Sequence, residues 1–191
     1  MAGATAEILL PDLPAEALAS WESTVAALST VREGNDFWVP PLEGNREVPL
    51  PFFWNTRHDR GDGWMFEGAQ DGVTVVRETF GFTPRASIAF GAMCRGRPSD
   101  RILARLASMF LAGREGALLF DGLLAPSLED PAWRAWYDSS ADERAARFIQ
   151  ALGPFVGRIV AVPIDGEPRH HAVDLPFLDF WQGHPAFHFV N

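Results

Sequence analysis

The chain has 191 residues, of which 47% are apolar and 12% are aromatic, including seven Trp and 15 Phe. This composition excludes global disorder and predicts one folded domain, residues 1–191, with a sizeable core. No segment is apolar enough for a transmembrane helix, and the first residues lack the basic flank of a signal peptide. We therefore expect a cytoplasmic protein without a membrane partner. The single cysteine, Cys94, agrees with a reducing compartment.

The net charge of −9 is unevenly distributed along the chain. Residues 1–82 carry 13 acids and five arginines, a net −8, whereas residues 83–191 carry 12 acids and 11 arginines, a net −1. All 16 basic residues are arginines, so the chain lacks the lysine of P-loop, pyridoxal and protein-kinase sites. A nucleic-acid partner is not expected, because phosphate neutralisation needs a net basic face.

The first half of the chain predicts a strand, a helix and a β-rich segment. Residues 4–10 predict the strand, and the helix follows Asp12 and Pro14 with apolar residues every three or four positions. Residues 36–79 are rich in turns and predict a β-rich insert. The short strands expected within this insert are residues 37–39, 51–54, 64–67 and 73–79.

The second half alternates strands and helices. We expect, in chain order, a strand at 85–94, a helix at 98–111, a strand at 116–120, a helix at 140–152, a hairpin of 155–164 and 169–173, a helix capped by Asp174, and a strand at 187–190. The first three of these elements form a βαβ pattern. The whole order predicts an α+β fold: a single-domain sandwich with a mixed β-sheet and helices mostly on one face.

Several residue runs, most of them after residue 83, resemble those of a known family. They are Ala92-Met93-Cys94, Asp100-Arg101-Ile102-Leu103, the strand from Gly116 to Gly122, Val173-Asp174, Phe177-Leu178, Trp181, His184-Pro185 and Phe187. These runs are similar to those of an uncharacterised bacterial family, domain of unknown function 6368, which is common in actinomycetes. The family brings no established activity. Small acidic α+β proteins of this kind are often immunity proteins of toxin systems, so the resemblance implies such a role by analogy.

Cys94 is the candidate nucleophile of the chain. It lies where a strand gives way to a helix, in a sequence that resembles the nucleophile elbow of α/β-hydrolases. A short segment separates it from the predicted helix, so we expect a buried thiol and no catalytic residue. The alternative is a hydrolase or transferase that depends on Cys94, with His170, His171 or His184 as base and Asp174 orienting that base.

The histidines predict no metal site and no cofactor. His170 and His171 are adjacent on a predicted strand and therefore point to opposite faces. His184 and His188 have helical spacing, but Pro185 breaks the helix between them.

Acidic and aromatic residues gather in the irregular segment of the first half. These aromatic residues fit either a small satellite core or an exposed binding surface. The predicted partner-binding residues are Asp36, Trp38, Glu43, Glu47, Trp54, Asp59, Asp62, Trp64 and Glu67. Such a surface favours an immunity-like protein that neutralises a cognate toxin with a basic domain. The alternatives are the Cys94-dependent enzyme and a sensor that binds a small molecule in an apolar pocket.

Overall fold

The computed structural model describes residues 4–42, 48–58, 70–94, 96–121, 152–164 and 167–184, together with Ser139, Glu143, Arg147, Ile149, Gln150 and Phe187. Its elements are, in chain order, β1 (Thr5–Leu10), α1 (Ala15–Leu28), β2 (Val31–Glu33), β3 (Asp36–Val39), β4 (Leu50–His58), α2 (Gln70–Phe80), β5 (Ala86–Ala92), α3 (Arg97–Leu111), β6 (Ala117–Asp121), β7 (Ile159–Ile164), β8 (Glu167–Val173) and α6 (Leu175–Gln182). These elements confirm the α+β class.

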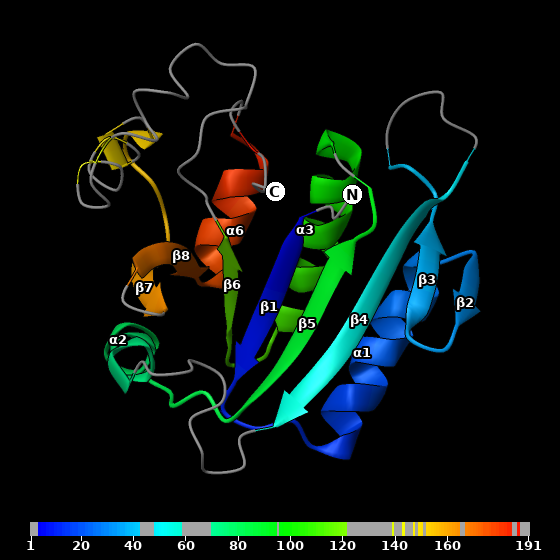
Figure 1. Ribbon diagram of the computed structural model, residues 1–191, viewed down its shortest axis with the longest axis horizontal. Coiled ribbons are helices and arrows are strands. Elements are labelled where there is room, and N and C mark those ends of the chain that lie inside the picture. Colours follow the sequence, from blue (N-terminus) through cyan, green and yellow to red (C-terminus); the bar gives the residue numbers. More distant parts are fainter. Residues whose placement is uncertain are drawn as a thin grey trace.

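The strands form one sheet with the order β2-β3-β4-β5-β1-β6-β8-β7. Every pair of neighbouring strands in the described part of the chain is antiparallel, so the expectation of a mixed sheet is wrong. The predicted βαβ pattern explains the difference. β5 and β6 run in the same direction and α3 joins them, but β1 lies between them and runs the opposite way (Figure 1).

Three helices, α1, α3 and α6, cover one face of this sheet (Figure 1). Trp21 of α1 lies near the middle of the packed layer. Its ring centroid is 5.2 Å from that of Phe90 on β5 and 5.5 Å from that of Phe110 on α3. All three side chains are at most 1% exposed, so burial of large aromatic surface joins a strand to two helices.

The segment 73–79 forms part of helix α2, so the strand predicted there is wrong. Its Val and Thr residues favour strands by propensity. However, Val73, Val76 and Phe80 recur at intervals of three and four residues, and this stripe packs with Leu9 of β1 on the second face of the sheet. Burial of a helical stripe therefore outweighs the local preference of β-branched residues.

Asp174 caps the N-terminus of α6, as predicted. Its Oδ1 accepts hydrogen bonds from the backbone N–H groups of Phe177 (3.1 Å) and Arg158 (2.8 Å), and its Oδ2 accepts one from Arg158 Nε (2.9 Å). Arg158 Nη1 donates to the backbone oxygen of Thr79 (3.0 Å), and the guanidinium lies over the ring of Phe80. We call Asp174, Arg158 and Thr79 the Asp174 junction, because they tie α2, β8 and α6 together.

Most other predicted elements are confirmed. The first strand and helix, the strands at β3, β4, β5 and β6, helix α3, the β7–β8 hairpin and helix α6 all form. The strand predicted at 64–67, most of the strand predicted at 187–190 and most of the helix predicted at 140–152 lie outside the described residues. No helix in the described ranges is long and apolar enough to cross a membrane.

Gly157 provides a test of the Asp174 junction. Its φ is 91°, and an added Cβ would overlap the backbone nitrogen of Phe177 and Asp174 Oδ1. We expect Gly157→Ala to lower the free energy of unfolding by about 3 kcal/mol or more, measured by urea denaturation. The matched control is Gly153→Ala: its φ is 64° and nothing lies within 4 Å of its Cβ position. It should cost only about 1 kcal/mol. An equal loss of unfolding free energy in the two variants would contradict the prediction that the added Cβ at position 157 overlaps its neighbours.

Candidate binding site on the open face of the sheet

The second face of the sheet, which we call the open face, lies opposite to α1, α3 and α6. Among the described helices only α2 packs on it, over the part formed by β1, β6, β8 and β7. Because side chains alternate along a strand, the residues that flank the core positions point to the open face. Thus Glu7 of β1 faces away from the buried Ala6 and Ile8.

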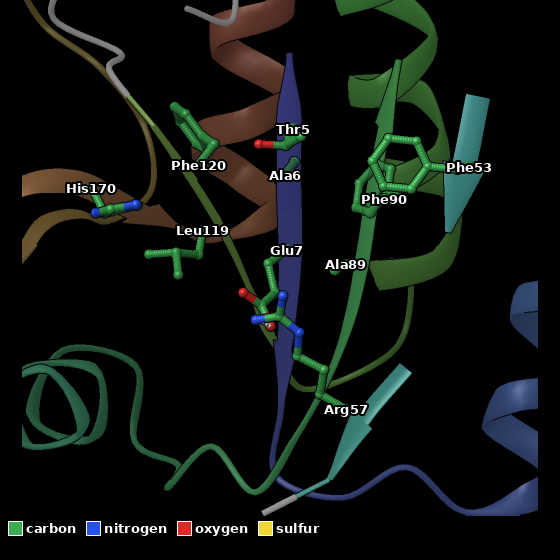
Figure 2. Close-up of a pocket in the computed structure, with 10 residues that line it drawn as sticks. All are labelled: Thr5, Ala6, Glu7, Phe53, Arg57, Ala89, Phe90, Leu119, Phe120 and His170. Atoms are coloured by element: carbon green, nitrogen blue, oxygen red, sulfur yellow. Dashed lines mark ion pairs between the residues drawn. The ribbon is translucent and has the colours of Figure 1, made fainter. Parts of the chain in front are cut away.

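A pocket of about 400 Å³ lies on the open face, next to the part covered by α2. Strands β1, β4, β5, β6 and β8 all contribute to it (Figure 2). The side chains that give it its chemistry are Thr5, Glu7, Phe53, Arg57, Leu119 and His170. The pocket therefore combines a carboxylate, a guanidinium, a hydroxyl and an imidazole with apolar and aromatic walls.

An aromatic wall of the pocket depends on a glycine. Gly91 of β5 lies opposite Phe53 of β4 on one side and Thr5 of β1 on the other. A Cβ at Gly91 would lie 2.8 Å from Cζ of Phe53 and 2.9 Å from Cγ2 of Thr5. The missing side chain lets the Phe53 ring lie against the strand backbone, which is the usual reason for glycine inside a strand.

Glu7 is the acidic group of the pocket. Its carboxylate Oε1 accepts a hydrogen bond from Ser87 Oγ and lies 3.8 Å from Arg57 Nη1. The Glu7 side chain is 15% exposed and that of Arg57 is 51% exposed. In the described part of the chain no hydrogen bond reaches Oε2 of Glu7. In Figure 2 the two side chains lie together near the middle of the pocket.

Two of the predicted partner-binding residues lie on the same face of the sheet as this pocket. Asp36 and Trp38 alternate with the core residues of β3, so they point to the open face. Asp36 is the cross-strand neighbour of Phe53. Both side chains are half-buried. The open face thus extends from the pocket across β4 to β3.

Trp54 lies elsewhere, although it was predicted as part of the same surface. It points to the helix-covered face and meets Trp21 edge to face, with a centroid distance of 6.3 Å. It therefore cannot share a binding surface with Trp38. The remaining predicted residues lie outside the described residues, and they are Glu43, Glu47, Asp59, Asp62, Trp64 and Glu67.

The adjacent histidines of β8 lie on opposite faces, as strand alternation predicts. His170 lines the pocket on the open face. His171 belongs to the helix-covered face and is 3% exposed. Burial, and to a lesser degree the neighbouring charge of His170, lowers the pKa of His171 from its ordinary 6.5 to about 4. His171 is therefore neutral at physiological pH.

The residues of the alternative Cys94 mechanism do not all come together. Cys94 Sγ lies 3.2 Å from Ser99 Oγ at the start of α3, on the helix-covered side. Asp174 caps one end of α6, and His184 follows the other end and stacks on Trp181. A helix of eight residues is about 12 Å long, so Asp174 does not orient His184. Within the described ranges, no group of three or more His, Cys, Asp or Glu side chains could hold a metal ion.

Known proteins place the chain in a family. Residues 2–191 match the family described as "Family of unknown function (DUF6368)". The chain belongs to this family. No curated protein and no solved structure matches the chain. The family assignment therefore agrees with the sequence resemblance and leaves the function to be inferred from the site.

The sequence did not point to the pocket. One signal was present: Glu7 is the charged residue of a strand whose other residues, apart from Thr5, are apolar. Nothing local indicated Arg57 or Ser87, because both approach Glu7 only through the pairing of β4, β5 and β1. Long-range strand order decides which polar residues meet.

The buried His171 predicts a pH-dependent stability. Between pH 6.5 and 4 the unfolded chain binds a proton at His171 that the folded chain does not, so stability falls as pH falls through this window. The loss amounts to about 1.4 kcal/mol per pH unit, or about 3 kcal/mol in total. We expect His171→Leu to remove this part of the slope in urea denaturation at stepped pH. Subtracting the stability profile of this variant from that of the natural chain removes the contribution of carboxylates that titrate in the same pH range. Parallel curves would contradict the prediction.

Proposed function

We propose that this chain is an immunity-like binding protein, which neutralises a cognate bacterial toxin by holding a basic surface of the toxin against the open face. The observation that carries the proposal is the pocket in that face, where Glu7 lies among aromatic and apolar walls. Asp36 and Trp38 extend the same face toward the edge of the sheet. Aromatic residues such as Trp38 are enriched among the residues that contribute most to protein recognition, and polar residues typically surround them at the rim.

The distribution of charge supports the proposal. Residues 1–82, with a net charge of −8, supply β1, β3 and β4, and these strands carry Glu7, Asp36, Trp38 and Phe53. A negative field speeds the encounter with a basic partner, and buried contacts then slow its release. The proposal places the protein in the cytoplasm, in agreement with its single thiol.

A rescue assay tests this function. The reading frame beside the gene is expressed in a bacterial host with and without this chain, and surviving colonies are counted. We expect the neighbouring product to be toxic and this chain to restore growth. Trp38→Ala should weaken the binding of the purified pair by about 30-fold or more, as loss of an aromatic anchor does. Glu22→Ala, an exposed residue on α1, is the control. A harmless neighbour, or equal killing with and without this chain, would overturn the proposal.

A second candidate is a small-molecule sensor, and the size of the pocket favours it. About 400 Å³ falls within the range of roughly 300–1,000 Å³ for ligand sites. Native mass spectrometry of the purified protein tests it directly. A bound compound that survives gentle ionisation and is lost on denaturation would favour the sensor, and a mass equal to that of the bare chain would count against it.

A further inference from the structure

We infer that the pocket on the open face receives an arginine side chain of the bound partner, and that Glu7 is the residue that recognises it. The inference rests on the proposed function and names the contact at its centre. The observation that supports it is that the carboxylate of Glu7 is mostly buried in a pocket with apolar walls and has one oxygen without a hydrogen bond in the described part of the chain.

The position of Glu7 is unfavourable for stability alone. It lies on β1, which pairs with β5 on one side and β6 on the other, opposite Ala89 and Leu119. Its side chain is only 15% exposed. Removing a carboxylate from water is costly, whereas Thr or Val would fill a strand position without that penalty. A charged residue at a mostly buried strand position, where an apolar or β-branched residue is usual, indicates that function constrains the sequence there.

The contacts of Glu7 leave room for a donor. Ser87 Oγ donates to Oε1, and Arg57 Nη1 lies 3.8 Å from the same atom. An ionised carboxylate has about four acceptor positions on its two oxygens. Oε2 receives no hydrogen bond within the described ranges, and it is not sealed from solvent. A donor entering the pocket can therefore bond Oε2 while Ser87 and Arg57 keep their places.

Arg57 does not close the site to a cation. A distance of 3.8 Å is too long for a hydrogen bond, and its side chain is half-exposed, so water screens its charge. Asp36 adds a further negative charge on the same face. A guanidinium is weakly hydrated and planar, so it tolerates a second guanidinium nearby better than an ammonium does.

The walls of the pocket fit the rest of an arginine side chain. The ring of Phe53 lies against Gly91 and offers an apolar surface, and Leu119 offers another from β6. Methylene groups pack on such surfaces while the charged end reaches a polar group. A guanidinium over an aromatic ring gains a cation–π attraction. Shape and charge together favour arginine over a compact cation.

The test uses single amino-acid derivatives and the full chain. N-acetyl-L-arginine methylamide is titrated into ¹⁵N-labelled protein, and backbone amide shifts are followed by NMR. The neutral isostere N-acetyl-L-citrulline methylamide serves as the matched probe. We expect saturable shifts around Glu7, Phe53 and Leu119 with the arginine probe, and binding at least about tenfold weaker with the citrulline probe, as for loss of a charge-assisted hydrogen bond.

Three variants sharpen the result. Glu7→Gln keeps an acceptor for Ser87 and should fold with an unchanged thermal midpoint, but it should lose the preference for arginine. Glu22→Gln removes the same charge from an exposed position on α1 and should bind like the natural chain. Arg57→Gln removes the nearby positive charge and should strengthen arginine binding by about two- to fivefold.

Two outcomes overturn the inference: equal binding of the two probes, or no saturable shift with arginine. A Glu7→Gln variant that folds and binds arginine as before overturns it as well. Should Glu7→Gln fail to fold, the comparison of probes on the natural chain and on Arg57→Gln still decides. Because this titration needs no partner, an absent arginine signal overturns the contact alone, and the rescue assay separately decides the proposed function.

Discussion

The insertion of β1 between β5 and β6 is the constraint on which the rest of the structure depends. The first strand pairs on both sides, so the chain from β5 through α3 to β6 must cross over it. Its even positions, Ala6, Ile8 and Leu10, join the core under the helices. Its odd positions therefore point to the open face, which places Glu7 at the middle of the sheet.

The Asp174 junction sets how much of the open face is covered. By holding Arg158 against both the capped end of α6 and Thr79 at the end of α2, Asp174 fixes where α2 packs on the sheet. Helix α2 buries Leu9, and the pocket lies next to the covered part, on strands β4, β5, β1, β6 and β8. The buried carboxylate of Asp174 thus defines the border of the uncovered surface, and on that surface the carboxylate of Glu7 can accept a further hydrogen bond.

Local patterns in the sequence predicted most of the fold and little of the site. The strand signal of residues 4–10, the capping residue Asp174 and the helical pattern of α3 depend on only a few residues each, so they can be recognised along the chain. The strand predicted at 73–79 failed because its helical stripe is stabilised by a distant strand. The pocket was missed for the same reason: Glu7 and Arg57 lie on strands separated by β5. Of the predicted binding residues in the described ranges, Asp36 and Trp38 share the face of the pocket, and Asp36 is the cross-strand neighbour of Phe53, which lines it.

The side chains of Asp174 and Glu7 differ in the hydrogen bonds that they accept. Asp174 is 6% exposed and accepts three hydrogen bonds, and both of its oxygens take part in them within the fold. The Glu7 side chain is 15% exposed, against 9% for that of Asp174, and Ser87 Oγ and Arg57 Nη1 both approach the same oxygen, Oε1. A carboxylate whose hydrogen bonds are complete stabilises the fold, whereas one that keeps an open oxygen gains its remaining partner only from outside. This contrast is the physical reason to assign structure to Asp174 and recognition to Glu7.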